Sequence, residues 1–211
     1  MKEKNLKIVF VIDESGSMQG SEQDVIGGFN GFINRQKNEN VGIVSISLYK
    51  FNTDVSLVYL DVPINNIESI TKKDYNPNGF TALYDAIGMA ITETGNKLSA
   101  NKSKHNRENV LIVIITDGQE NASKEYTSQT VKSLISTHEK LLQWNFIYLG
   151  VGLKDFTDAS VLELKNRAKL KKDNIVADFD KISDSCIRFS ISPCMKMDSE
   201  VQELINDLNN E

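Results

Sequence analysis

Apolar residues recur along the chain in two alternating patterns. Short continuous runs rich in β-branched residues are typical of strands buried on both faces of a sheet, and apolar residues at every third or fourth position are typical of helices that cover it. The predicted strands are Lys7–Ile12, Gly42–Tyr49, Val55–Leu60, Val110–Thr116, Asn145–Val151 and Asn174–Ala177. The predicted helices are Ser21–Lys37, Thr81–Leu98, Thr127–Leu142, Asp158–Leu170 and Asp180–Ile191, with a short one near Ile64–Ile70.

The order of these elements predicts an α/β fold. Strands that alternate with helices form a parallel sheet covered on both faces. The short link Phe51–Asp54 indicates a hairpin, which adds one antiparallel strand at an edge. We therefore expect a doubly wound, mainly parallel six-stranded sheet. With no Pro/Gly-rich linker and no repeat, residues 1–191 are expected to form one domain, and residues 192–211 a short, partly helical C-terminal appendage.

Composition narrows the class of protein. The 211 residues are 40% apolar and 25% charged, which is ordinary globular usage, and the net charge of −5 argues against nucleic-acid binding. No run approaches the ~20 apolar residues of a membrane span, and the charged start lacks a cleavage site, so we expect a cytoplasmic protein with no membrane partner. Cys186 and Cys194 are expected to be small buried or half-buried thiols. The oligomeric state is not predicted.

Two aspartates follow apolar strands. Asp13 ends the first strand and Asp117 follows the fourth. Because ligands of open parallel sheets bind beyond the carboxyl ends of the strands, these two side chains are candidates for a site. If the strands are neighbours, their axes lie ~5 Å apart and the two carboxylates repel by roughly 3 kcal/mol at an effective dielectric of about 20. A shared proton or a bound cation would relieve this repulsion.

Three hydroxyl residues complete the candidate donor set. Ser15 and Ser17 alternate in the loop after the first strand, and Thr81 begins a long helix. Each residue alone has an ordinary interpretation as a helix cap or turn residue, so the hypothesis depends on all of them lying at one end of the sheet. Two carboxylates and three hydroxyls favour magnesium, with manganese or calcium as alternatives, whereas zinc usually prefers His or Cys.

These motifs resemble those of the von Willebrand factor type A (VWA) domain family. The resemblance extends from about Leu6 to Ile191 and includes the order of elements, hence a Rossmann-like sheet. The positions that carry it match the family's metal-ion-dependent adhesion site (MIDAS): Asp13-x-Ser15-x-Ser17, then Thr81, then Thr116-Asp117-Gly118. The usual Gly-Gly-Thr before the long helix is Gly79-Phe80-Thr81 in this chain, a departure that concerns the path of the loop.

The resemblance implies roles for each ligand. Ser15, Ser17 and Thr81 would bind the metal directly through their hydroxyls, while Asp13 and Asp117 would act largely through bridging waters. One coordination position would remain open for an Asp or Glu carboxylate of a protein partner. In some members of the family the threonine and the second aspartate exchange as direct ligands, which gives two affinity states.

We therefore expect a non-enzymatic, magnesium-dependent protein-binding module. The alternatives are a magnesium-dependent phosphatase or hydrolase with Asp13 as nucleophile, a VWA domain whose metal is purely structural, and a nucleotide-binding domain, for which the glycine-rich loop is missing. Specificity is expected from the rim of the site, where Glu120 would disfavour some acidic partners. The rim residues are Glu14, Met18, Gln19, Asn78, Phe80, Gln119, Glu120 and Asn121.

Overall fold

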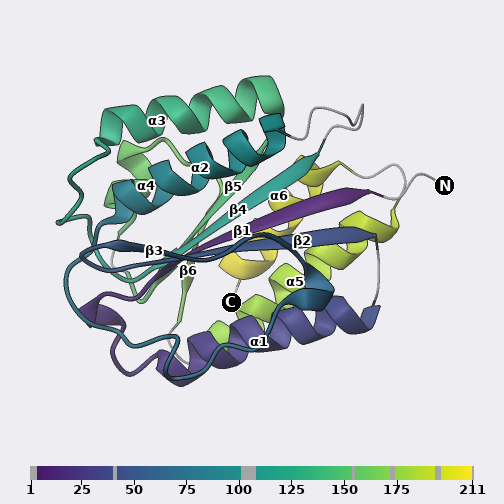
Figure 1. Cartoon of the computed structure of the whole chain (residues 1–211), viewed down its shortest axis with the longest axis horizontal. Coiled ribbons are helices and arrows are strands. Elements are labelled where there is room, and N and C mark those ends of the chain that lie inside the picture. The colour runs from purple at the N-terminus through teal and green to yellow at the C-terminus, as the bar shows by residue number, and fades with distance from the viewer. Residues whose placement is uncertain are drawn as a thin grey trace.

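The computed structural model describes residues 4–39, 42–100, 108–153, 155–171, 174–192 and 196–210. Within these ranges six strands form one sheet in the order β3-β2-β1-β4-β5-β6 (Figure 1). The strands are β1 (Asn5–Asp13), β2 (Ile43–Phe51), β3 (Val55–Pro63), β4 (Asn109–Thr116), β5 (Asn145–Val151) and β6 (Arg167–Leu170). All neighbours are parallel except β2 and β3, which confirms the predicted mainly parallel sheet with one antiparallel edge strand.

Helices cover both faces of the sheet, as expected for a doubly wound fold. One face carries α1 (Glu22–Glu39) and α5 (Ile175–Ile191), and the other carries α2 (Leu83–Ala100), α3 (Ser128–Thr137) and the short α4 (Thr157–Val161) (Figure 1). A last helix, α6 (Met197–Asn209), joins the layer of α1 and α5. None of the helices in the described ranges is both long and apolar enough to span a bilayer.

The central strand β1 is buried on both sides. Phe10 points toward α1 and α5, where its ring meets Phe29 and Phe32 edge-on at centroid distances of 5.5 and 5.1 Å. Val9 and Val11 point to the opposite face and pack in the second core with α2. Because successive side chains of a strand alternate between faces, two cores require an uninterrupted apolar run, which is the pattern in the sequence.

The last strand is not where the sequence pattern predicts it. The predicted helix Asp158–Leu170 is wrong: α4 ends at Val161, Glu163 adopts a left-handed φ of 57°, and the chain then forms β6 beside β5. The predicted strand Asn174–Ala177 is also wrong, because those residues lie at and within the start of α5. A strand of four residues carries too little periodicity to be separated from a helix, so its pairing with β5 decides its conformation.

The C-terminal helix α6 packs against α5 and β6 through an apolar face and one buried acid. Glu200 is fully buried, and its Oε2 accepts hydrogen bonds from Ser185 Oγ at 3.0 Å and Arg188 Nε at 3.2 Å. Cys186 lies in the same layer and is buried as expected, and burial raises the pKa of its thiol to about 12. The other cysteine lies outside the described residues.

The strand order reverses direction between β1 and β4. The two strands are parallel neighbours, with Ile12 opposite Ile115, so Asp13 and Thr116 end at the same edge of the sheet. In doubly wound sheets this reversal leaves a crevice outside the carboxyl ends of the strands. The topology therefore places the two predicted aspartates at the position where such folds bind ligands.

Candidate metal centre

Asp13 ends β1 and is fully buried. Its Oδ1 accepts a hydrogen bond from the backbone N–H of Ser15 at 2.7 Å, and its Oδ2 accepts one from Thr116 Oγ1 at 2.5 Å. Its carbonyl oxygen accepts a hydrogen bond of 2.6 Å from the hydroxyl of Tyr75, a buried residue. The carboxylate is thus held in one orientation by neutral donors from two strands and their loops.

The charge of this carboxylate is poorly compensated within the protein. Burial raises the pKa of Asp13 to about 6, although the hydrogen bonds from Thr116 and Ser15 act in the opposite direction. The nearby Asp117 raises the pKa further. Within the described chain no lysine or arginine forms an ion pair with Asp13. A buried carboxylate without a cationic partner is costly, and an added cation would remove that cost.

The three predicted hydroxyl ligands lie beside the two aspartates. The Oγ atoms of Ser15 and Ser17 are 3.0 Å apart, and Ser17 Oγ donates to Asp117 Oδ1 at 2.5 Å. A Cβ atom built on Gly118 would lie 3.1 Å from Thr81 Oγ1, 3.3 Å from Ser17 Oγ and 3.7 Å from Asp13 Oδ2. Side chains from three separate segments therefore converge on the space beside Gly118.

This donor set fits a hard divalent cation. All of its side-chain donors are oxygen atoms, and small hard cations prefer oxygen ligands. Only two of the five residues are acidic, and in the described ranges no three or more His, Cys, Asp or Glu side chains cluster around a possible ion. The hydroxyls are therefore needed to complete the coordination, which favours an ion that accepts neutral ligands and water.

The loop that carries Thr81 is held by backbone hydrogen bonds to several other segments. Asn78 N–H donates to Glu14 O at 2.9 Å, and Ala82 N–H donates to Asn52 O at 2.7 Å. Phe80 N–H donates to Thr53 Oγ1 at 3.0 Å, and Thr81 N–H donates to Asn121 Oδ1 at 2.9 Å. These partners lie in the loop after β1, the β2–β3 hairpin and the loop after β4. With Phe80 at the position before it, Thr81 keeps its hydroxyl within the cluster.

The position of Gly79 requires glycine for two reasons. Its φ is 74°, a left-handed value that favours glycine. A Cβ at this position would also lie 2.7 Å from Thr53 Oγ1, the atom that accepts the hydrogen bond of the next residue. The glycine thus lets the loop approach the β2–β3 hairpin closely, which fixes the start of α2.

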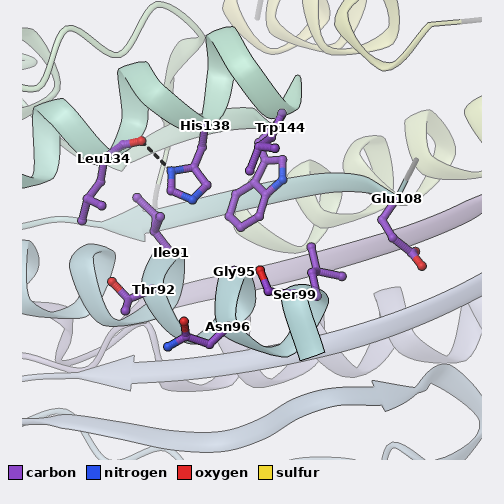
Figure 2. Close-up of a pocket in the computed structure, with 11 residues that line it drawn as sticks. Ile91, Thr92, Gly95, Asn96, Ser99, Glu108, Leu134, His138 and Trp144 are labelled. Atoms are coloured by element: carbon purple, nitrogen blue, oxygen red, sulfur yellow. Dashed lines mark hydrogen bonds between the residues drawn. The ribbon is translucent and has the colours of Figure 1, made fainter. Parts of the chain in front are cut away.

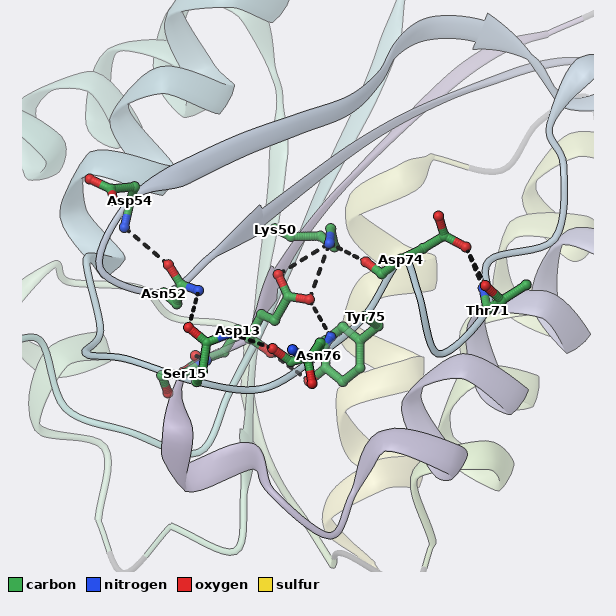
Figure 3. A network of polar contacts seen from close by, with 11 residues as sticks. Asp13, Ser15, Lys50, Asn52, Asp54, Thr71, Asp74, Tyr75 and Asn76 are labelled. Atoms are coloured by element: carbon green, nitrogen blue, oxygen red, sulfur yellow. Dashed lines mark hydrogen bonds and ion pairs between the residues drawn. The ribbon is translucent and has the colours of Figure 1, made fainter.

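Glu14 is part of the support of the site rather than of its rim. It is buried, and both of its carboxylate oxygens accept hydrogen bonds of 3.1 Å from Lys50 Nζ (Figure 3). Lys50 also donates to the carbonyl oxygen of Asp74, and Asn76 N–H donates to Glu14 Oε1. This network ties the segment before Gly79 to the ends of β1 and β2, so the prediction that Glu14 faces a partner is wrong.

Glu120 is likewise engaged inside the protein. Its Oε2 accepts hydrogen bonds from Tyr84 N–H at 2.9 Å and from Ser123 Oγ at 2.7 Å. Its Oε1 accepts from the backbone N–H groups of Ala122 and Ser123 at 2.9 and 2.7 Å. The carboxylate therefore joins the first turn of α2 to the loop after β4, and the expectation that it disfavours acidic partners loses its basis.

The remaining predicted rim residues divide by exposure. Met18 is buried in the core, so it does not belong to the rim. The exposed ones are Gln19, Asn78, Phe80, Gln119 and Asn121. All five are uncharged, although exposed charged residues such as Asp54 and Lys124 lie on neighbouring loops.

Sequence reasoning missed two residues that shape the site. Thr116 received no role, although its hydroxyl is a direct partner of Asp13. The sequence pattern assigns no role to Lys50, yet it forms an ion pair with the buried Glu14. Both could have been noticed as polar residues in the last two positions of their strands, because such positions face the loops at the carboxyl edge of the sheet.

The opposite end of the sheet has a different character. A cavity of about 490 Å³ lies between α2, α3 and the turn before β5, and its walls are mainly apolar (Figure 2). The rings of His138 and Trp144 pack together at a centroid distance of 4.4 Å, and His138 Nδ1 donates to Leu134 O at 2.7 Å. Trp144 is buried between helix and strand. None of the five predicted ligands lines this cavity.

Comparison with known sequences agrees with the resemblance in the motifs. The sequence profile of the von Willebrand factor type A domain matches residues 8–119, which is more than half of the chain and includes all five predicted ligands. No curated protein sequence matches the chain.

Solved structures share the fold at low sequence identity. The pilus adhesin SpaC from Lactobacillus rhamnosus GG superposes with a TM-score of 0.66 at 15% identity, over 90% of this chain and 31% of SpaC. The von Willebrand factor domain of the type V pili tip protein Mfa5 from Porphyromonas gingivalis gives 0.63 at 12% identity, over 93% and 99%. Proximal thread matrix protein 1 from the mussel byssus, with a zinc-occupied MIDAS motif, gives 0.57 at 16% identity, over 88% and 46%. The chain thus spans less than half of SpaC and of the mussel protein, and these similarities concern the fold alone.

Proposed function

Since the chain belongs to the von Willebrand factor type A domain family, we propose that it is a divalent-metal-dependent protein-binding module. The observation that carries the proposal is the convergence of Thr81, Ser17 and Asp13 oxygens on the space beside Gly118. Asp117 and Ser15 join this cluster through Ser17. The metal would offer an open coordination position to an Asp or Glu carboxylate of a partner.

Magnesium is the cation that this set of ligands supports best, with manganese or calcium as alternatives. Ser15, Ser17 and Thr81 would supply hydroxyl oxygens, and Asp13 and Asp117 would supply the negative charge. In the mussel protein a zinc ion occupies the corresponding motif. In this chain the cluster has no His or Cys ligand, which favours a harder cation than zinc.

Two alternatives are less well supported. A hydrolase with Asp13 as nucleophile would need that carboxylate to reach a substrate, but it is fully buried and both of its oxygens accept hydrogen bonds. A purely structural metal would not require an exposed ligand, yet Ser17 is exposed at the surface of the cluster. The adhesive roles stated for SpaC as a pilus adhesin also favour a binding module.

Thermal unfolding with and without magnesium tests the metal site. A ligand that binds only the folded state, at a concentration a hundredfold above its Kd, stabilises that state by about 2.7 kcal/mol. For a chain of this size, each kcal/mol of added stability raises Tm by roughly 2–4 °C. We expect magnesium to raise Tm, EDTA to reverse the rise, and Asp13→Ala to abolish it. Asp207→Ala, an exposed aspartate on α6, is the matched control and should respond like the parent.

Equal responses of parent and Asp13→Ala to magnesium would overturn the site. A pull-down from lysate of the native host, with and without EDTA, then separates a binding module from a structural brace. Capture that persists in EDTA would favour the brace, whereas capture that needs the metal and Asp13 would support the module.

A further inference from the structure

Phe80 is exposed on the face that surrounds the candidate metal. Among the described residues eight large apolar side chains are exposed, and Phe80, at 65%, is the one aromatic side chain in this group. It directly precedes Thr81, which is buried and points its hydroxyl toward Gly118. Two consecutive residues of one loop thus point in different directions. The side chain of Thr81 faces the candidate metal cluster, and that of Phe80, the residue before it, faces solvent.

The loop presents this ring in a preorganised way. The backbone N–H of Phe80 is bonded to Thr53 Oγ1, and that of Thr81 to Asn121 Oδ1. Gly16 N–H donates to Gly79 O at 3.1 Å, which ties the same loop to the segment that carries Ser15 and Ser17. Binding through a loop whose backbone is already ordered loses less conformational entropy, so an aromatic residue on this loop is well suited to anchor a partner.

The loops around the ring carry exposed amides together with the exposed Asp54. The two acidic rim candidates point inward: Glu14 binds Lys50, and Glu120 binds backbone and hydroxyl donors. The exposed amides on the loops of the site are Gln19, Asn76, Asn78, Gln119 and Asn121, and the exposed Asp54 follows Thr53 in the β2–β3 hairpin. An exposed aromatic side chain among amides is a composition typical of protein interfaces.

We propose that Phe80 forms the second contact of a two-point recognition site. The partner is a protein segment in which an Asp or Glu has a large apolar side chain next to it, with the carboxylate directed to the metal and the apolar side chain packed on Phe80. Because Phe80 and Thr81 are adjacent, their Cα atoms are about 3.8 Å apart, so neighbouring residues on a turn of the partner, whose side chains can point the same way, reach both contacts. The inference rests on the proposed metal-dependent function and specifies its class of partner.

An array of synthetic peptides tests the proposal. Each peptide contains a central Glu followed by Phe, Leu, Ser or Lys, and a matched series has Gln in place of Glu. The labelled full chain is applied in magnesium and in EDTA, as the parent, as Phe80→Ser and as Leu141→Ser. Leu141 is 69% exposed and lies before β5, at the other end of the sheet, so it controls for the general loss of an exposed apolar side chain.

In magnesium the parent and Leu141→Ser should retain the Glu-Phe and Glu-Leu peptides about tenfold more strongly than Glu-Ser. Phe80→Ser should lose this preference while its rise in Tm with magnesium stays unchanged. Equal retention of all Glu peptides, an unchanged preference in Phe80→Ser, or no magnesium-dependent retention would each overturn the role of Phe80. In each of these cases the thermal unfolding experiment decides what else fails. If magnesium still raises the Tm of the parent and Asp13→Ala still abolishes the rise, the metal site stands. If the parent shows no such rise, the proposed function is overturned as well.

Discussion

The two ends of the central sheet bury opposite kinds of side chain. The carboxyl end buries acidic residues beside the candidate metal cluster: Asp13, Glu14, Asp85 and Asp158. The amino end holds a mainly apolar cavity in which Trp144 and His138 pack together (Figure 2). Both ends belong to the same strands, so the difference arises from the loops and helix ends that meet there.

Helix direction explains much of this contrast. In a doubly wound sheet the helices that follow the strands begin at the carboxyl edge, so their N-terminal N–H groups and partial positive charge are concentrated there. Asp85, in the first turn of α2, accepts hydrogen bonds from the backbone N–H groups of Lys124, Glu125 and Tyr126 at 2.8, 3.0 and 2.7 Å. Acidic side chains can therefore be buried at this end, although burial raises the pKa of Asp13 to about 6.

The comparison implies that substitutions at the amino end change stability without changing metal binding. Trp144→Ala removes a large buried side chain and the ring contact with His138, so we expect the free energy of unfolding to fall by about 3–5 kcal/mol. Urea denaturation measures this loss. The rise in Tm with magnesium should stay within error of that of the parent, and a reduced rise would mean that the two ends are coupled.

At the carboxyl end we expect a substitution to raise stability when no metal is bound. The pKa of Asp13 is about 6 in the folded protein against 3.8 ordinarily, so the folded state holds this proton more tightly and stability falls as pH rises through that window. Asp13→Asn removes this penalty, which amounts to up to about 3 kcal/mol above pH ~6. In EDTA the variant should therefore be more stable than the parent near neutral pH and similar to it near pH ~4.

Urea unfolding across this range, in EDTA and in magnesium, measures the difference. The variant should show little response to magnesium, so the order of stability reverses when the metal saturates the parent. A parent that is more stable than Asp13→Asn in EDTA at neutral pH would contradict the view that this carboxylate is uncompensated.

Two glycines allow a matched test with smaller effects. A Cβ on Gly118 would meet Thr81 Oγ1 at 3.1 Å and Ser17 Oγ at 3.3 Å, so Gly118→Ala should weaken magnesium binding at least about tenfold by crowding the donors. A Cβ on Gly95, inside α2 beside the cavity, would approach no closer than 3.6 Å to His138 Nε2. Gly95→Ala should stabilise the protein by roughly 0.5–1 kcal/mol, because alanine favours the helix.

Isothermal titration with magnesium and thermal unfolding distinguish these outcomes. The comparison would fail if Gly118→Ala bound magnesium as tightly as the parent, or if Gly95→Ala weakened binding.

Much of the fold was accessible from the sequence because burial leaves a periodic signature. The apolar runs of β1 and β4 predicted central strands, and the hairpin link predicted the antiparallel β3. The last strand was misplaced because the four residues of β6, with Ala168 and Leu170 buried, fit a helical spacing as well as an alternating one. An edge strand gains its conformation from pairing, which local periodicity does not encode.

The candidate site was predicted as a set of residues but not as an arrangement. All five proposed ligands lie together, yet the supporting contacts of Thr116 and Lys50 were missed. The rim was partly wrong, since Glu14, Met18 and Glu120 turn inward. A surface position in a loop gives no sequence signal for the direction of its side chain, which depends on the donors that the folded chain brings near it.

What the sequence determined by itself is the alternation of strands and helices and the chemistry placed at the end of each strand, because both follow from short-range patterns of burial. The tertiary structure decided that Ser17 and Asp117, 100 residues apart, share a hydrogen bond, and that Phe80 faces solvent beside them. These outcomes depend on strand order and on loops closed by distant hydrogen bonds, and therefore on contacts that exist only once the sheet has assembled.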